Sequence, residues 1–94
     1  MRGMDTTFEQ FQQSALADGF DAVLQRDWAP DTVLDTHTHP FAVRAVVVAG
    51  QMWMSVDGVE RELTVGDTFV LEANVPHAER YGPVGASYWV ARRN

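Results

Sequence analysis

The stretch 42-AVRAVVVAGQMWMSVDGVERELTV-65 decides the fold of this chain of 94 residues. Within it, the runs 52–56 and 59–65 flank Asp57-Gly58, and an Asp-Gly pair between two such runs is the strongest short signal for a β-hairpin. The run 45–49 is apolar at every position, whereas a strand with one face in water would alternate apolar and polar residues. The stretch therefore predicts paired strands, one of which is covered on both faces.

The second cover for the run 45–49 has two candidate sources. It can come from a helix elsewhere in the chain or from a second copy of the protein. We expect the second copy, in a homodimer, because two-fold pairs are the commonest oligomers.

The residues around this stretch are also organised as short strands. Beyond Gly19, runs rich in Val, Thr, Phe and Trp alternate with turn residues, about one turn for every 8 to 15 residues. This rhythm predicts an all-β sandwich or barrel for residues 20–94, as a single domain. Gly82-Pro83 predicts a second hairpin within it.

Residues 1–19 form a lead-in and one short helix in this prediction. Thr6-Thr7-Phe8-Glu9 has the form of a capping box, in which Thr6 and Glu9 satisfy each other's backbone N–H groups. Apolar residues follow at helical spacing. The helix should end at Asp18-Gly19, because glycine readily adopts the left-handed conformation that ends helices.

Composition excludes several classes of function. The chain has no cysteine, so that any metal must rest on nitrogen and oxygen ligands. A net charge of -6, with the seven basic residues scattered apart from Arg92-Arg93, argues against nucleic acid as a partner. No stretch approaches the roughly 20 apolar residues of a membrane span. Residues 1–5 lack the apolar region of a signal peptide, and we expect a cytoplasmic protein that does not bind membranes.

All three histidines stand at the openings of predicted strands. His37 and His39 are two residues apart, so on an extended chain their side chains project to the same face and can bind one ion. His77 follows Pro76 at the start of another predicted strand. Three protein ligands with an open position suit a catalytic metal, although histidines near a turn can equally well face water.

The spacing of these residues resembles the two motifs of the cupin superfamily over about residues 31–81. The first motif contains two histidines, a glutamate and a glycine, and the second contains a glycine, a proline, a glycine and a histidine. The positions that match are His37, His39, Gly50, Gly66 and His77. The resemblance implies a double-stranded β-helix (jelly-roll) barrel, here all-β with one short N-terminal α-helix. It also implies a divalent transition metal, iron, zinc, nickel or manganese, at His37, His39 and His77.

The chain departs from the family motifs at several positions. Val43 stands in the place of the metal-binding glutamate, and the neighbouring Arg44 cannot coordinate a cation. Glu72 and Asn74 replace the second motif's proline and glycine, and asparagine tolerates the left-handed turn that a glycine would supply. Cupins that resemble cysteine dioxygenase hold Fe(II) with three histidines, whereas others have lost the metal and only bind ligands. The retained histidines favour a metal.

Two further residues, Glu79 and Tyr81, are candidates for catalysis. His77, Glu79 and Tyr81 share one face of the predicted strand, and Ala78 and Arg80 share the other. Glu79 can serve as a displaced fourth ligand, as an acceptor that orients an imidazole, or as a proton-transfer group. The alternative is a surface carboxylate paired with an arginine, because carboxylates are seldom buried without a partner.

The expected function is that of a small metal-binding protein. Arg44 points away from Val43, and we therefore place it on the exterior or in an interface instead of assigning it to a substrate carboxylate. A largely apolar cavity with a metal floor suits a small organic molecule as substrate or ligand. If the protein is an enzyme, the resemblance implies a dioxygenase-like or isomerase-like step. The alternative is a non-catalytic module that binds or senses a small molecule.

Overall fold

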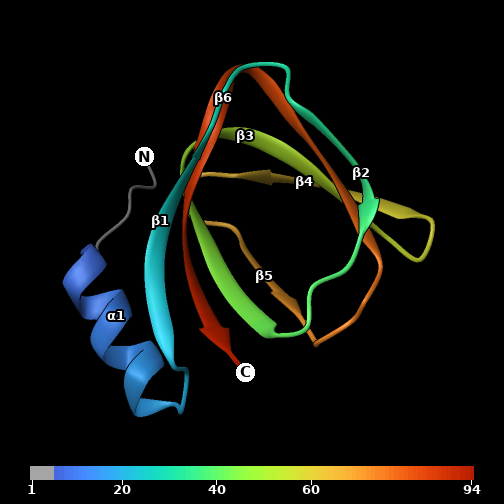
Figure 1. Cartoon of the computed structure of the whole chain (residues 1–94). Helices are drawn as coiled ribbons and strands as arrows, with labels where there is room; N and C mark the ends of the chain where they lie inside the picture. The colour runs from blue at the N-terminus through green and yellow to red at the C-terminus, as the bar shows by residue number, and fades with distance from the viewer. Residues whose placement is uncertain (1–5) are drawn as a thin grey trace.

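The computed structural model describes residues 6–94 and contains one helix and six strands among them (Figure 1). Residues 1–5, part of the predicted lead-in, lie outside the described residues. The elements are α1 Phe8–Ala17, β1 Ala22–Trp28, β2 Val33–His37, β3 Ala42–Val56, β4 Val59–Thr64, β5 Thr68–Leu71 and β6 His77–Arg93.

Two long strands, β3 and β6, organise the barrel. They pair with each other in antiparallel register, and each also pairs with shorter strands on its other side. β3 carries β4 and β5, whereas β6 carries β1 and β2. Curling the two long strands places the short ones around a common interior, which confirms the predicted all-β jelly roll (Figure 1).

The predicted hairpin at Asp57-Gly58 is confirmed. Val56 of β3 pairs directly with Val59 of β4, so Asp57 and Gly58 form the whole turn. Both have positive φ, 55° for Asp57 and 79° for Gly58, as a type I′ turn requires. The hairpin faces its apolar side inward, where Met52 and Leu63 are fully buried.

The predicted hairpin at Gly82-Pro83 is wrong. β6 continues through these residues from His77 to Arg93. Its pairing with β3 jumps from Gly50 opposite Ala86 to Met52 opposite Tyr81, so the four residues 82–85 of β6 stand opposite Gln51 alone in the register of β3. Extra residues bend a strand locally, and proline, which has no N–H to donate, is tolerated at such a bulge. The turn signal therefore marks the bend at which β6 passes from pairing with β1 to pairing with β2.

The helix begins one residue later than predicted. Its N-cap is Thr7, whose hydroxyl accepts from the backbone of Gln10 while the Gln10 side chain accepts from the backbone of Thr7. Thr6 and Glu9 were the wrong pair, because the adjacent threonine with glutamine at N3 meets the same requirement. The predicted end is confirmed by Gly19 with a φ of 93°. Within residues 6–94 no helix has the length and apolar character needed to cross a membrane.

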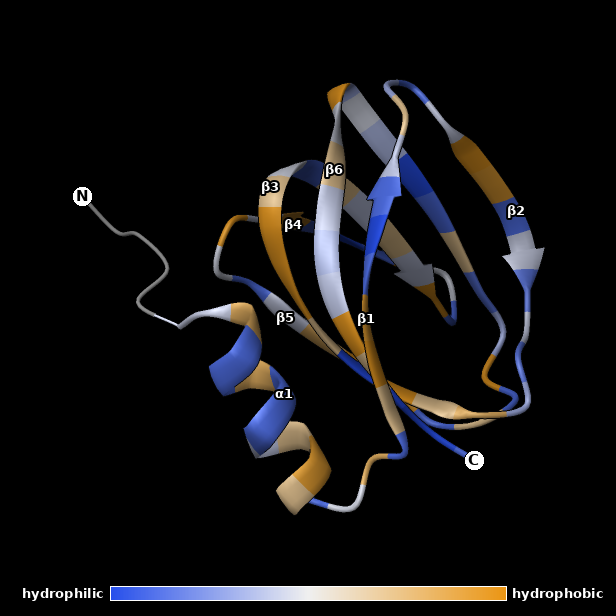
Figure 2. Ribbon diagram, turned by 60° about the vertical axis from the view of Figure 1, so that its left-hand side comes forward, coloured by the Kyte–Doolittle hydropathy of each residue, from blue (hydrophilic) through white to orange (hydrophobic). Residues whose placement is uncertain are grey.

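The helix packs on the outside of the barrel. Phe8 and Phe11 contact Trp89 of β6, with ring centroids 5.7 and 6.0 Å apart. Hydrophobic and hydrophilic residues form alternating bands along α1, as expected of a helix with one packed face (Figure 2). Arg44 pairs with Asp18 at 2.9 Å on this outer side, which confirms its predicted exterior position.

The apolar run of β3 is covered differently on its two faces. Val43, Ala45 and Val47 point into the barrel and belong to its core. Val46 points outward, is 7% exposed, and borders a groove that Phe11 of the helix also lines. The helix therefore contributes the outer cover, and the homodimer remains a prediction.

Candidate metal centre

The pairing of β2 with β6 brings two of the histidines together. His37 ends β2, His77 begins β6, and the two residues are register partners across the ladder. Their ring centroids are 4.3 Å apart. His39 lies in the connection from β2 to β3, with its ring 4.9 Å from that of His77 and 6.5 Å from that of His37. Residues far apart in the sequence thus form one cluster of imidazoles.

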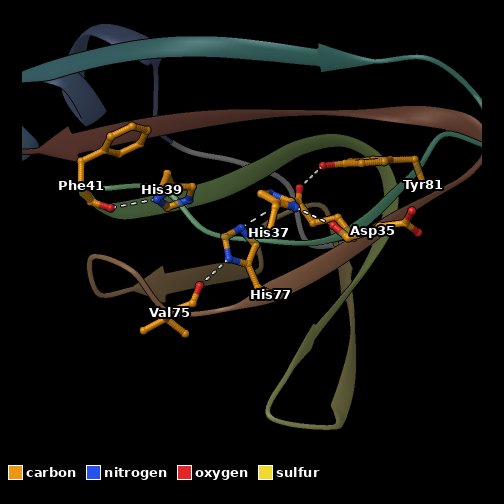
Figure 3. A network of polar contacts seen from close by, with 8 residues as sticks. Asp35, His37, His39, Phe41, Val75, His77 and Tyr81 are labelled. Atoms are coloured by element: carbon orange, nitrogen blue, oxygen red, sulfur yellow. Dashed lines mark hydrogen bonds and ion pairs between the residues drawn. The ribbon is translucent and has the colours of Figure 1, made fainter.

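Each imidazole is oriented by a backbone carbonyl. Nδ1 of His37 lies 2.7 Å from the carbonyl oxygen of Asp35, and Nδ1 of His77 lies 2.9 Å from that of Val75 (Figure 3). Nδ1 of His39 lies 2.9 Å from the carbonyl oxygen of Phe41. A carbonyl only accepts, so Nδ1 carries a proton in each ring, and in the neutral tautomer this leaves the lone pair on Nε2. This is the arrangement that metal-binding histidines usually have.

Glu79 adds a carboxylate to the two paired histidines. Its Oε2 lies 3.4 Å from Nε2 of His37 and 3.5 Å from Nε2 of His77. Ligand atoms about 2.1 Å from one tetrahedral ion lie about 3.4 Å from each other. The three ligand atoms all lie within 4.8 Å of one another, and the cluster therefore has the donors and the spacing to hold a metal ion.

The structure places the predicted site residues unequally. Glu79 is 7% exposed and faces the histidines, which rules out the alternative of a surface carboxylate paired with an arginine. His39 stands beside the cluster and stacks on Phe41, with centroids 4.4 Å apart. Val43, in the position of the family's glutamate, is buried in the cavity wall. Asn74 has a φ of 66°, so it does adopt the left-handed turn of the glycine it replaces.

Tyr81 contacts Glu79 on the side away from the two histidines. Its hydroxyl donates to Oε1 of Glu79, the oxygen that does not face His37 and His77. Burial raises the pKa of Tyr81 far above its usual value, and the nearby Tyr88 and Glu79 raise it further. The phenol therefore stays neutral and remains a donor. Its ring stacks on Trp28 at 5.2 Å, and the cavity is lined by Glu79 but not by Tyr81 among the described residues.

The cluster opens into a cavity of about 150 Å³ inside the barrel. The wall is mixed, with slightly more apolar than polar lining residues. Polar groups come from the histidines, Glu79 and Tyr88, and burial raises the pKa of Tyr88, as does the charge of Glu79. The apolar lining residues are Leu24, Trp28, Leu34, Phe41, Val43, Met54, Phe69, Leu71 and Val90.

Sequence reasoning missed two charged residues of the wall, Arg26 and Arg92. The signal was present in the alternation of the strands. Arg26 lies between Leu24 and Trp28 on the inward face of β1, and Arg92 follows Val90 on the inward face of β6. An arginine flanked at two-residue spacing by large apolar residues is a candidate for the interior.

The family of the chain follows from its sequence. The cupin domain family matches residues 26–81, more than half of the chain, and the chain belongs to this family. No curated protein sequence matches the chain.

Solved structures agree with this assignment. One is a chain from crystal structures of the DMSP lyases RdDddP and RnDddQII, 25% identical with a TM-score of 0.70, covering 77% of this chain and 37% of that one. A second, an RmlC-like cupin from Shewanella frigidimarina, is 26% identical with a TM-score of 0.66 over 74% of this chain and 62% of that one. KdgF from Halomonas sp., 20% identical with a TM-score of 0.65 over 77% and 67% of the two chains, shares the fold. This chain spans about a third to two thirds of the first two chains.

Proposed function

We propose that this cupin binds a divalent transition metal through His37, His77 and Glu79 and uses it to transform a small organic molecule. His39, whose Nε2 is free, is the further donor for which the family motif provides. Two imidazoles and one carboxylate suit zinc or Fe(II), while manganese and nickel accept the same atoms. The histidine triad of the motif is thus retained and Glu79 is added to it.

One observation carries this proposal. Glu79 is a buried carboxylate with one oxygen held by Tyr81 and the other directed at two Nε2 atoms. The Nδ1 atoms of both rings are committed to carbonyls, so in the neutral rings each Nε2 presents a lone pair toward the carboxylate. Three electron-pair donors that face one another are stabilised by a cation between them, and a divalent metal ion matches two imidazoles and one carboxylate in charge and spacing.

The residues of the cavity would have separate tasks in a reaction. A bound metal would supply Lewis acidity and positions for the substrate's oxygen atoms. The apolar wall excludes water from the substrate. The neutral Tyr88 offers a hydroxyl at the cavity, and Tyr81 positions Glu79 without reaching the substrate itself. Dioxygenase-like and isomerase-like steps suit such a site, and the similarity to a chain of the DMSP lyases adds elimination as a third reaction class.

Metal analysis of protein purified without a histidine tag tests the proposal. Elemental analysis after reconstitution with Fe(II), Zn(II), Ni(II) and Mn(II) should give about one ion per chain. His77→Ala and Glu79→Gln should reduce this occupancy, whereas Glu72→Gln, at an exposed glutamate outside the cavity, should not. Full occupancy in both Glu79→Gln and His77→Ala would remove the metal from this site.

A non-catalytic binding module is the second candidate function. The observation in its favour is Val43, which replaces the family's usual ligand and leaves an apolar wall beside the histidines. Oxygen uptake and product analysis on the Fe(II)-loaded protein with candidate diketones, thiols and diols separate the two functions. Binding without turnover of any candidate would favour the module.

The assembly and location of the protein are part of the same proposal. We expect a homodimer in the cytoplasm, with a small molecule as the partner and neither nucleic acid nor a membrane. Light scattering of the purified chain should give twice the mass of 10.5 kDa. A monomeric mass over the working concentration range would contradict the dimer and leave the metal site unaffected.

A further inference from the structure

Two arginines enter the cavity from one wall of the barrel. Arg26 lies on β1 and Arg92 on the C-terminal half of β6, and both line the cavity together with the histidines and Glu79. β1 and β6 are paired, with Arg26 opposite Tyr88 and Arg92 opposite Ala22. The two Cα atoms are therefore about 14 Å apart along one ladder.

Neither guanidinium has an acidic partner among residues 6–94. Arg44 pairs with Asp18 and Arg80 with Glu60, both on the outside of the barrel, but no carboxylate oxygen lies within 4.0 Å of Arg26 or Arg92. Both guanidinium groups instead lie over aromatic rings of the cavity wall. Charges at a cavity that are left without a counter-ion are candidates for ligand contacts.

The aromatic contacts hold the two arginines without using their N–H groups. Cζ of Arg26 lies 4.8 Å from the centroid of Trp28, and Cζ of Arg92 lies 4.9 Å from that of Phe41. A cation above a ring is held by the ring's quadrupole, and the guanidinium keeps its N–H donors for a planar anion. Phe41 also stacks on His39, so Arg92 is connected to the histidines through two ring contacts.

The charge of the cavity is opposite to that of the whole protein. The chain has a net charge of -6, which repels anions. The cavity has two arginines against the single carboxylate of Glu79, and that carboxylate is already directed at His37 and His77. Arg26 is exposed and Arg92 is half-buried, so both guanidinium groups are accessible to an anion at the mouth of the cavity and create a locally positive potential there.

We infer that the ligand of this cavity is a small organic anion with at least one carboxylate, bound by Arg26 and Arg92. Guanidinium groups bind carboxylates through paired, charge-assisted hydrogen bonds. The inference rests on the proposed function, since it names the class of molecule that the metal would act on. The cavity of about 150 Å³ limits this molecule to a small acid and excludes a polymer.

Calorimetric titration with succinate and malonate tests the inference, with succinamide and malonamide as uncharged matches. The variants are Arg26→Gln, Arg92→Gln and the double variant. Arg93→Gln is the matched control, because Arg93 is exposed and lies over Phe20, outside the cavity. We expect the native protein to bind a diacid, the double variant to bind it at least about tenfold more weakly, and Arg93→Gln to bind it unchanged. The diamides should not bind.

Repeating the titrations on zinc-loaded and metal-free protein separates this inference from the proposed function. Loss of diacid binding in the double variant of the metal-free protein supports the anion site whatever happens to the metal. Zinc content should be equal in all arginine variants. Equal diacid binding by the native protein and the double variant, equal binding of diamides, or no binding at about 10 mM would overturn the inference and leave the metal site standing.

Discussion

β2 and β6 carry the two halves of the proposed metal site, and they are supported very differently. β6 extends over 17 residues and is paired with β3 on one side and with β1 and β2 on the other. β2 has five residues, pairs with no strand but β6 among residues 6–94, and changes register between Leu34 and His37. Burial follows the same division, since the side chain of His77 is 2% exposed and that of His37 is 38% exposed.

This difference shows how a small barrel can prepare a site and still admit a ligand. Residues of a doubly paired strand move only if two ladders break, so His77 and Glu79 are fixed before any ion binds. A short edge strand opens locally at a lower free energy. We interpret β6 as the preorganised half of the site and β2 as the adjustable half.

The largest effect should come from disturbing the close contact between β3 and β6. Gly50 of β3 has a φ of 75°, and a Cβ there would lie 2.0 Å from the carbonyl oxygen of Gly85 in β6. Gly50→Ala should therefore lower the free energy of unfolding by about 3 kcal/mol or more, from strain and overpacking together. Thermal or urea unfolding measures the loss.

Gly58→Ala is the matched control for this substitution. Gly58 has a similar φ of 79°, but a Cβ there meets nothing within 4 Å. Only the backbone strain remains, and we expect a loss of about 1 kcal/mol. Equal losses in the two variants would show that the contact between β3 and β6 is looser than the distance implies.

The second effect concerns the ion and compares the two strands directly. Zinc at about 100 times its dissociation constant should raise the free energy of unfolding by about 2.7 kcal/mol. His77→Ala should abolish this stabilisation, since it removes the buried donor on β6. His37→Ala should retain part of it, because His39, in the connection that follows β2, lies next to His77 and can replace the lost donor. Thermal unfolding with and without zinc measures both, and a larger loss in His37→Ala would reverse our assignment of the two halves.

The third effect tests whether Tyr81 stabilises the Glu79 carboxylate on β6. Tyr81→Phe removes the hydroxyl that donates to the buried Oε1 of Glu79. An unsatisfied buried acceptor costs about 1 to 3 kcal/mol, so the metal-free variant should unfold at lower urea. Tyr88→Phe is the comparison, because Tyr88 neighbours Tyr81 but makes no hydrogen bond to Glu79 among the described residues, and its loss should therefore be smaller. The interpretation fails if both variants are as stable as the native protein.

The smallest effect lies on the outer face of β6. Hydrogen bonding to Arg80 lowers the pKa of Glu60 below its usual value. The pair therefore adds stability above the unfolded pKa and loses it as the pH falls through the folded pKa. In Arg80→Gln, the pKa of Glu60 should rise toward its usual value, which an NMR titration measures. Metal binding should be unchanged. A changed metal affinity would mean that the outer face of β6 is coupled to the inner one.

Much of the fold could be predicted because its signals are local. The Asp57-Gly58 turn, the helix end at Gly19 and the left-handed Asn74 each depend on the φ that one or two residues prefer. Gly82-Pro83 misled the same reasoning, since a turn signal and a bulge signal use the same residues. Only the ladders on both sides of β6 distinguish a bend within a strand from a reversal of the chain.

The site was only partly predictable. Alternation along one strand placed His77 and Glu79 on a common face, and the spacing of His37 from His77 indicated the cupin family. Nothing local could show that Glu79 lies between these two histidines while His39 stands beside them. The inward positions of Arg26 and Arg92 were likewise visible only as a pattern, without a sign of which face was the interior.

The sequence by itself determined most of the strands, the Asp57-Gly58 turn and which residues are candidate ligands, because these depend on residues close together in the chain. The tertiary structure alone decided which of those atoms meet. His37 and Glu79 become neighbours only through the pairing of β2 with β6, and that pairing is set by the packing of the whole barrel. Contacts between distant segments depend on the burial of many apolar side chains at once, which no short stretch of sequence records.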